Sequence, residues 1–375
     1  MKKTIKIYNS KVYYAQLKTV FIGLSMGLLL LSGCSSSDPT PPTVEPEAPV
    51  VDPEPDPIEL DLSYLPMGNG STTPYMRGTF IDFWGKQDWS SSDWDAHMVE
   101  MKEVGIEILI VQFTAYGDNV WVNFNTNYGT NVYPDALPRL LDAAAKENIG
   151  VYVGLYFDDE YWNNATDITT LKTHAQRSKD LANEIWTMNK TKTSFKGWYI
   201  THEPAPYYYK TQGDLNVLKN NLIDPIADYC KSISGKPVGM SAFFNHNETD
   251  VPAFKTFIAG LGSSNIELLI LQDGIGVYHC DLTTIESYYA AANEALYDNG
   301  FKGAFWADLE TFKNVSPTDE TSNPEAIDVV TQKMDLVKDY VSTIVTFQYY
   351  HDMSPTGPRK ALAKKLRDDY LDYLP

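Results

Sequence analysis

The chain has 375 residues, of which 43% are hydrophobic and 21% are charged, and these values are typical of a globular protein with a full core. It carries 30 Lys and Arg against 49 Asp and Glu, a formal net charge of −19. This acidity argues against nucleic acid and anionic polysaccharide as partners, because both would be repelled. Aromatic residues reach 13%, which suits contact with the flat faces of neutral sugars as well as core packing.

The first 33 residues have the pattern of an export signal. Lysines come first, an apolar run over 20–31 follows, and the run ends in LSGC at residues 31–34. The run is shorter than a membrane span requires. Its last four residues resemble the lipobox of bacterial lipoproteins, which implies that Cys34 carries a lipid anchor in the cell envelope. We expect an outer-membrane protein that faces the periplasm or the cell surface, and an ordinary secretion signal is the alternative.

Residues 34–70 are expected to form a spacer. Eight prolines and many acids lie within residues 34–57, and such a composition favours extended conformations and cannot bury a core. The other two cysteines, Cys230 and Cys280, lie in separate segments and are interpreted as core residues. Their pairing cannot be deduced from the sequence.

From residue 78 onward, apolar strand patterns alternate with helical patterns. The predicted strands are 78–84, 106–113, 149–157, 196–200, 236–244, 266–272, 302–309 and 342–350. The predicted helices are 93–105, 138–148, 168–189, 215–233, 251–261, 282–300, 324–340 and 358–374. Eight such units predict an α/β fold, a parallel sheet closed into a single (β/α)₈ barrel over residues 75–373. A doubly wound open sheet is the alternative, but no glycine-rich phosphate motif follows the first strand.

Two glutamates at strand ends form the candidate catalytic pair. The active site of such a barrel lies at the C-terminal ends of its strands, where Glu203 follows the fourth strand and Glu310 the seventh. Facing each other across the mouth, the two carboxylates can flank one glycosidic bond, one as acid and the other as base or nucleophile. We therefore predict a monomeric glycoside hydrolase that needs no cofactor. No HExxH or CxxC motif indicates a metal site, and no GxSxG motif within the predicted barrel indicates a serine esterase.

Other carboxylates compete for the second catalytic role. Asp308 lies two residues before Glu310 and therefore on the same face of the strand. Residues 158–160, Asp-Asp-Glu, follow the third strand and serve either as catalytic acids, as a cation site or as a solvated loop. Two rival functions stay open: a non-catalytic glycan-binding lipoprotein, and an enzyme of different chemistry that uses residues 158–160 with a cation.

Polar or aromatic residues end nearly every predicted strand, as a substrate site requires. Trp121 and Trp162 are candidate sugar platforms, with ordinary packing as the alternative. The residues expected to bind substrate are Asp82, Trp84, Gln112, Tyr156, His202, Tyr207, Gln272, Trp306 and Tyr349.

The His-Glu-Pro sequence at 202–204, with Glu310 after the seventh strand, resembles the large clan of retaining glycoside hydrolases. In that clan the fourth-strand motif is Asn-Glu-Pro. The resemblance implies that Glu203 is the acid/base, that Glu310 is the nucleophile, and that His202 takes the place of an Asn that holds the sugar 2-hydroxyl. More closely, GTFIDFWGKQDWSSSDW at 78–94 and WADLETF at 306–312 resemble the bacterial domain-of-unknown-function family 4434, which is regarded as glycoside-hydrolase-like.

Overall fold

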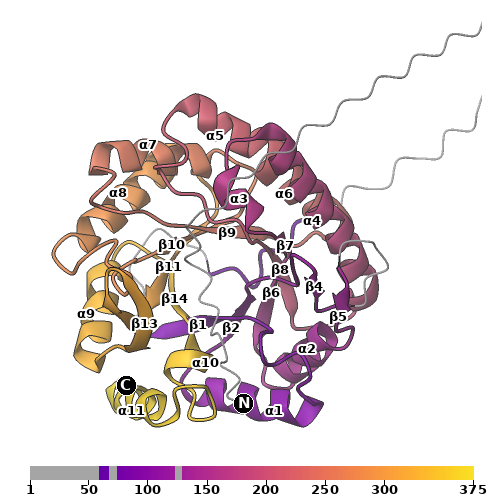
Figure 1. Ribbon diagram of the computed structural model, residues 1–375, viewed down its shortest axis with the longest axis vertical. Helices are drawn as coiled ribbons and strands as arrows, with labels where there is room; N and C mark the ends of the chain where they lie inside the picture. The colour runs from indigo at the N-terminus through magenta and orange to yellow at the C-terminus, as the bar shows by residue number, and fades with distance from the viewer. Residues whose placement is uncertain (1–58, 67–73, 123–128) are drawn as a thin grey trace, which may run out of the picture. The chain divides into compact units, whose positions relative to one another are not determined.

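Eight parallel strands close into a barrel, and helices surround it (Figure 1). This arrangement confirms the predicted (β/α)₈ barrel, and all described residues fall in the unit Ile58–Pro375. In ring order the strands are β1 (Met76–Ile81), β2 (Ile108–Val111), β6 (Gly150–Gly154), β8 (Phe195–Ile200), β9 (Val238–Ala242), β10 (Leu268–Gln272), β11 (Ala304–Glu310) and β14 (Thr343–Phe347), which pairs with β1.

The computed structural model describes residues 59–66, 74–122 and 129–375. The predicted signal, Cys34 and the predicted linker as far as residue 58 lie outside these residues. Among the described residues, no helix is long and apolar enough to cross a membrane.

Several of the outer helices begin at polar caps. Ser90 forms a capping box with Asp93, and Asp167 and Asp250 each accept a backbone N–H three residues on. The predicted helix 215–233 contains one π-helical turn, Lys219–Ile223. The helices are α1 (Ser91–Glu103), α2 (Ala136–Lys146), α4 (Ile168–Asn189), α5 (Gln212–Leu218), α6 (Asp224–Ser234), α7 (Val251–Gly262), α8 (Ile285–Asp298), α9 (Ile327–Val337) and α11 (Lys360–Tyr373).

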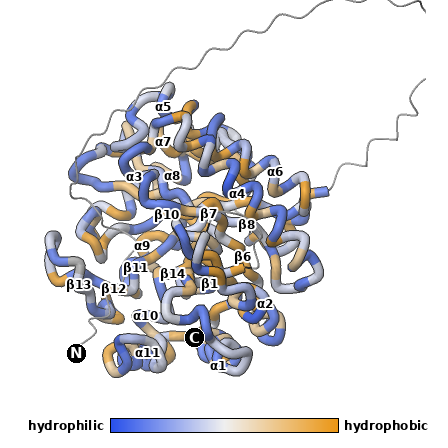
Figure 2. The backbone as a smooth tube through the Cα atoms, turned by 45° about the vertical axis from the view of Figure 1, so that its right-hand side comes forward, coloured by the Kyte–Doolittle hydropathy of each residue, from blue (hydrophilic) through white to orange (hydrophobic). Residues whose placement is uncertain are grey.

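The strands are apolar on both faces, and Figure 2 shows hydrophobic residues concentrated along them. On β11 the side chains of Phe305, Ala307 and Leu309 pack outward against the helices. Trp306 instead joins the cluster inside the barrel. Because side chains alternate along a strand, Asp308 and Glu310 share the inner face with Trp306.

Short elements extend the C-terminal ends of the strands. They lack the length and the periodic apolar pattern that reveal the barrel strands. They are a small sheet of β3 (Ala115–Tyr116), β4 (Asn119–Val120), β5 (Asn131–Val132) and β7 (Tyr156–Phe157), a hairpin of β12 (Phe312–Ser316) and β13 (Asp319–Pro324), and the helices α3 (Glu160–Asn163) and α10 (Tyr349–Asp352). Only β7 falls within a predicted strand, 149–157, whereas α10 begins where the strand predicted over 342–350 was expected to continue.

Residues 59–66 pack across the N-terminal ends of the strands. The Tyr64 hydroxyl donates to the Glu107 carbonyl at 2.5 Å and accepts the Gly150 N–H at 2.9 Å. The carbonyl of Pro66 accepts the Ser342 hydroxyl at 2.8 Å. This segment was predicted to be the end of the linker 34–70, but it belongs to the barrel unit, which begins at Ile58 rather than near residue 75.

Cys230 on α6 and Cys280 after β10 are both buried and unpaired. Burial raises the pKa of both thiols, that of Cys280 to about 12. Both are therefore protonated at neutral pH and act as small core residues.

Candidate functional site

Glu310 ends β11 on the inner face, at the C-terminal end of the barrel. Its Oε2 accepts the backbone N–H of Val277 at 3.2 Å, from the loop that follows β10. A Cβ at Gly276 would lie 2.9 Å from that oxygen and 2.3 Å from the Phe312 carbonyl. The loop therefore closes on the Glu310 carboxylate through its backbone, and residue 276 has no room for a side chain.

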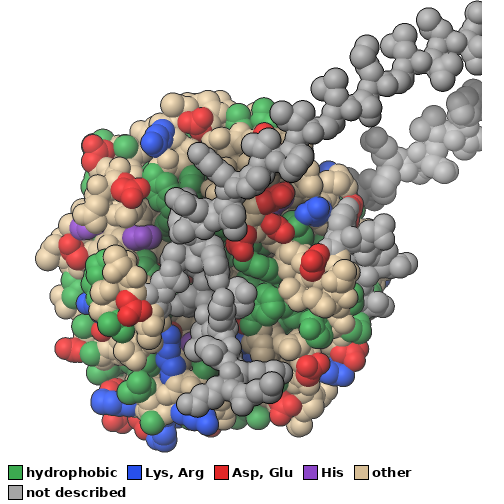
Figure 3. All heavy atoms as spheres, viewed as in Figure 1, with side chains coloured by type: hydrophobic (Ala, Val, Ile, Leu, Met, Phe, Trp, Pro, Cys, Tyr) green, Lys and Arg blue, Asp and Glu red, His purple; other side chains and the backbone are tan. Residues whose placement is uncertain are grey.

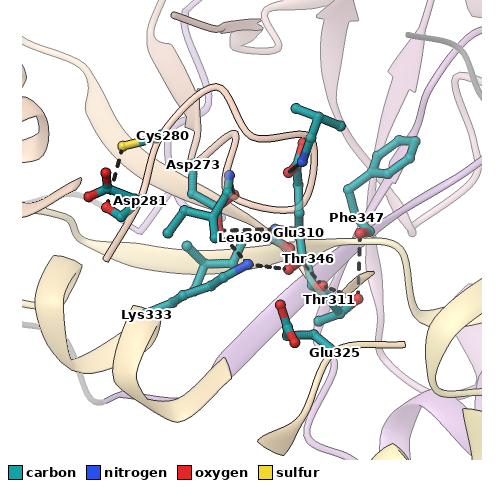
Figure 4. A network of polar contacts seen from close by, with 12 residues as sticks. Asp273, Cys280, Asp281, Leu309, Glu310, Thr311, Glu325, Lys333, Thr346 and Phe347 are labelled. Carbon is teal, nitrogen blue, oxygen red and sulfur yellow. Dashed lines mark hydrogen bonds and ion pairs between the residues drawn. The ribbon is translucent and has the colours of Figure 1, made fainter. Parts of the chain in front are cut away.

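A buried ion pair holds the backbone of Glu310 in place (Figure 4). Asp273 Oδ2 accepts the Glu310 N–H at 3.3 Å and lies 3.3 Å from Lys333 Nζ. Lys333, from α9, donates to the Glu310 carbonyl at 2.8 Å. Both side chains are fully buried. Together they bind the backbone N–H and the backbone carbonyl of Glu310, so the end of β11 is fixed in place.

Asp273 also fixes the loop that contacts Glu310, since its Oδ1 accepts the Ile275 N–H at 3.0 Å. Burial raises the pKa of Asp273 to about 6, because the Lys333 ammonium offsets only part of the desolvation and Glu310 adds repulsion. The sequence places Asp273 at the end of the sixth strand but gives no sign of this role. Its partner Lys333 lies 60 residues further on in a helix.

Glu203 lies in the loop three residues beyond β8 and is partly exposed. Its charge acts on the buried hydroxyl of Tyr199, inside the barrel. Burial is the main cause of the strongly raised pKa of Tyr199, and the charges of Glu203 and Asp308 both add to it. The carboxylates from β8 and β11 thus act on one group in the barrel interior. Asp308 lies two residues nearer the closed end than Glu310.

The structure corrects the prediction for His202. The ring is fully buried and packs edge-on against Tyr161 at 4.9 Å and Phe157 at 5.4 Å. Its Nε2 lies 2.8 Å from Nδ1 of His174 on α4. The side chain therefore points into the layer between barrel and helices, as Trp198 and Ile200 on the same strand do, and cannot contact a sugar in the mouth.

Two further predicted substrate residues lie away from the mouth. Trp306 is buried inside the barrel and donates its indole N–H to the Pro66 carbonyl at 3.2 Å, at the closed N-terminal end. Tyr349 is buried beneath α1, where its hydroxyl donates to the Glu100 carbonyl at 3.3 Å. Predicting contact with the mouth was wrong for both, because sequence position alone did not show which way each side chain turns.

Asp82 occupies the predicted place after β1, but protein groups use both of its oxygens. Oδ1 accepts the Trp84 N–H at 2.8 Å and lies 3.0 Å from Lys86 Nζ, and Oδ2 accepts the Gln348 amide at 3.2 Å. Burial opposes ionisation, yet the Lys86 charge keeps the pKa of Asp82 below its usual value. The Lys86 ammonium also lies 4.1 Å from the centre of the Tyr350 ring, so this cluster joins the ends of β1 and β14.

Of the remaining predicted substrate residues, two glutamines lie on the inner face of the barrel, whereas one tyrosine points outward to the helices. Gln112 follows β2 and Gln272 ends β10, both on the inner-face register of their strands. The Gln272 Oε1 has no hydrogen-bond partner among the described residues. Tyr156 instead turns toward α4, where Arg177 donates to its hydroxyl and lies 5.0 Å from its ring.

Half-buried aromatic rings form a group at the C-terminal end of the barrel. Tyr207 lies 4.4 Å from Tyr208 and 5.7 Å from Phe243, and Trp162 lies 6.0 Å from Tyr208. These rings come from the loops after β7, β8 and β9. Trp162 and Tyr207 were predicted as substrate contacts, whereas Tyr208 and Phe243 were not. Their adjacency depends on three loops that are distant in the sequence.

Trp84 and Trp121 form a second aromatic group. Their ring centres lie 4.9 Å apart, and Trp121 also stacks on Phe83 at 5.9 Å. Trp121 is fully buried and therefore packs as a core residue, whereas Trp84 is only partly buried.

The acidic loop Asp158–Glu160 forms contacts to its own chain. Asp158 Oδ1 accepts the Glu160 N–H at 2.9 Å, and Glu160 Oε1 lies 3.3 Å from His174 Nε2. Within residues 59–66, 74–122 and 129–375, no group of three or more His, Cys, Asp or Glu residues is arranged to hold a metal ion.

Several solved structures are similar to this chain. The "putative alpha-L-fucosidase" of Bacteroides thetaiotaomicron VPI-5482 matches with a TM-score of 0.67 at 23% identity, over 88% of this chain and 99% of that one. The endo-1,4-beta-mannanase of Rhizomucor miehei matches with a TM-score of 0.51 at 15% identity, over 82% and 99%. The beta-galactosidase of the psychrophilic Marinomonas ef1 matches with a TM-score of 0.52 at 10% identity, over 79% and 58%.

At these identities the matches establish a shared fold and nothing finer. No curated protein matches the sequence. The family model described as "Domain of unknown function (DUF4434)" matches residues 76–359, well over half of the chain. The chain therefore belongs to the DUF4434 family, and its barrel has the fold of glycoside hydrolases.

Proposed function

We propose that the protein hydrolyses O-glycosidic bonds of a neutral glycan with retention, through Glu203 as acid/base and Glu310 as nucleophile. One observation carries the proposal: Glu203 and Glu310 follow the C-terminal ends of β8 and β11 in a barrel with the fold of glycoside hydrolases. Only β9 and β10 lie between these two strands on one side of the ring. A pair of carboxylates so placed can attack and protonate one bond from two sides.

The two carboxyl groups differ in a way that suits two roles. The Glu310 carboxylate is buried and accepts a backbone N–H, which holds it in one direction, as a nucleophile requires. Glu203 is partly exposed, so it can exchange protons with water. In the first step Glu310 bonds to the anomeric carbon while Glu203 protonates the departing oxygen. In the second step Glu203 removes a proton from water, whose oxygen displaces Glu310 from the sugar.

The surroundings favour a neutral sugar. The aromatic group Trp162, Tyr207, Tyr208 and Phe243 offers apolar rings at the C-terminal end of the barrel. Gln272, with a buried oxygen that lacks a partner among the described residues, offers an uncharged acceptor for a hydroxyl. The net charge of −19 repels anionic glycans.

The test is hydrolysis of a panel of neutral substrates by the wild type, Glu203→Gln and Glu310→Gln. The panel contains 4-nitrophenyl fucosides, mannosides, galactosides and glucosides with matching oligosaccharides. Glu310→Gln should remove turnover of every substrate. Glu203→Gln should lose about 10²–10⁴-fold in kcat/KM on oligosaccharides and less on nitrophenyl glycosides, because a good leaving group needs no acid.

Asp308→Asn is the matched control, since Asp308 shares the inner face of β11 with Glu310. Activity that survives Glu310→Gln but not Asp308→Asn would assign the nucleophile to Asp308. Added azide should restore turnover to Glu310→Gly by occupying the vacated position. Proton NMR of the first product should show the anomer of the substrate. Saturable glycan binding without hydrolysis would replace the enzyme by a glycan-binding protein.

We also propose that Cys34 is lipidated and that the protein is held in the bacterial envelope. Support comes from LSGC at residues 31–34 after a basic and then an apolar stretch.

A further inference from the structure

A chain of three side chains runs from the surface to the residue before Glu203. Glu160, half exposed on α3, places Oε1 3.3 Å from His174 Nε2. His174 Nδ1 lies 2.8 Å from His202 Nε2, and both rings are fully buried. His202 Nδ1 has no hydrogen-bond partner among the described residues. None of these contacts is explained by packing of the barrel core alone.

The geometry determines where the protons lie. A 2.8 Å contact between two ring nitrogens needs one proton between them. If His174 Nε2–H donates to the Glu160 carboxylate, a neutral His174 has a bare Nδ1, and this nitrogen accepts from His202 Nε2–H. The opposite tautomers would leave the lone pair of His174 Nε2 facing a carboxylate. Both rings therefore carry their proton on Nε2 while the pair is neutral.

Burial favours the neutral form of both histidine rings. Burial lowers the pKa of His174, while Glu160 and Asp158 raise it and Arg177 lowers it further. Burial also lowers the pKa of His202, and a charge on His174 would lower it more. The remaining neighbours are the uncharged rings of Phe157, Tyr161 and Tyr156, of which Tyr156 lies 5.3 Å from His174.

We propose that His202 and His174 are positioning residues for Glu203. The hydrogen-bonded pair, with Glu160 at its surface end, connects the end of β8 to α4 and α3 on the outside of the barrel. These three side chains form an anchor. This anchor fixes the backbone of His202 and, through it, the direction in which the adjacent Glu203 side chain leaves the chain. The role assigned to Glu203 rests on the proposed function, but the anchor itself does not.

The anchor can be tested without any substrate. Nitrogen-15 NMR of the imidazoles, in the full-length protein with its six histidines, reports the tautomer and titration of each ring. His174 and His202 are identified by the signals that vanish in His174→Asn and His202→Asn. Both rings should show the Nε2–H tautomer at pH 7, and His202 should stay neutral well below the usual pKa of His. Titration of His202 near pH 6.5, or an Nδ1–H tautomer of His202, would overturn the proposal.

The effect on Glu203 is tested by the activity of two His174 variants. Asn can place its amide oxygen near the position of Nδ1 and accept from His202, whereas Leu fills the space and accepts nothing. His174→Leu should lower kcat about 10–100-fold with little change in KM, and His174→Asn should recover most of that loss. His246→Asn is the matched control. His246 lies after β9 and is hydrogen-bonded to Thr284.

Equal kcat values for His174→Leu and the wild type would refute the positioning role. So would equal losses in the Leu and Asn variants at equal thermal stability. If the wild type hydrolyses nothing, the proposed function fails, and the NMR result still decides whether the anchor exists.

Discussion

Asp273 is a buried carboxyl whose environment gives stability an unusual dependence on pH. Its pKa is about 6 in the folded protein and 3.8 in the ordinary reference state. Between these values the folded state holds a proton that the unfolded chain has lost. The contribution of this group to the free energy of unfolding therefore decreases as the pH rises from about 4 to about 6.

Asp273→Asn removes this titration while keeping the shape of the side chain. We expect the variant to gain stability relative to the wild type as the pH rises from 4 to 7, by up to about 3 kcal/mol, because two pKa units correspond to that energy. Urea unfolding of both proteins at pH 4, 5, 6 and 7 gives the difference directly, since other titrating groups cancel. A difference that does not vary with pH would contradict the pKa of Asp273.

The positions of Glu203 and Glu310 at strand ends could be predicted from the sequence, whereas the directions of several side chains could not. Glu203 and Glu310 follow from counting strands, because the mouth of a barrel is known once its strands are known. His202 was placed wrongly because a residue next to Glu203 points to the opposite side of the strand path. The contact between Asp273 and Lys333 could not be predicted from the sequence, because it depends on the packing of α9 against β11.

At the scale of elements, the eight strand and helix units were predictable because each has a regular apolar period. The predicted helix 168–189 has the same bounds as α4. The hairpin of β12 and β13 was not predicted, because its sequences FKNVS and DETSNP lack an apolar alternation, although the side chains of β12 alternate between buried and exposed. Residues 59–66 were not predicted to belong to the barrel unit, because the acidic, proline-rich composition of the linker continues almost to Tyr64.

Residues 59–66 should contribute measurably to stability. A chain that begins at residue 75 lacks the buried Leu65 and the Tyr64 hydroxyl that joins Glu107 to Gly150. We expect it to lose about 3 kcal/mol of unfolding free energy relative to a chain that begins at residue 59. Urea unfolding compares the two, and Tyr64→Phe in the longer chain separates the hydroxyl, worth about 1 kcal/mol. Equal midpoints and slopes for both lengths would show that the segment adds nothing.

At the scale of the whole molecule, the net charge bears on the proposed attachment of the protein to a membrane. Figure 3 shows acidic side chains spread over one face of the molecule, in keeping with the excess of 49 acids over 30 Lys and Arg. Such a surface is repelled by anionic lipid headgroups. Attachment to a membrane therefore needs the proposed lipid on Cys34 rather than electrostatic attraction.

Cys34→Ser tests this attachment. The wild type, expressed in a bacterium that processes lipoproteins, should be recovered in the membrane fraction and resist extraction by salt. The variant should appear in the soluble fraction or keep its unprocessed signal, because a hydroxyl cannot take the thioether-linked lipid. Mass spectrometry of the N-terminal peptide confirms the modification. A wild type released by high salt would show that charge, and not a lipid, holds it.

The two buried thiols can report local opening of the protein, because each reacts only when the structure around it opens. Cys230 lies in α6 of the helix layer, whereas Cys280 lies in the loop after β10 that contacts Glu310. A thiol reagent reaches Cys230 only when the helix layer opens, but it reaches Cys280 when that loop alone opens. In a protein without Cys34, two separate labelling rates would therefore measure how often the loop beside the proposed nucleophile opens while the rest of the barrel stays closed.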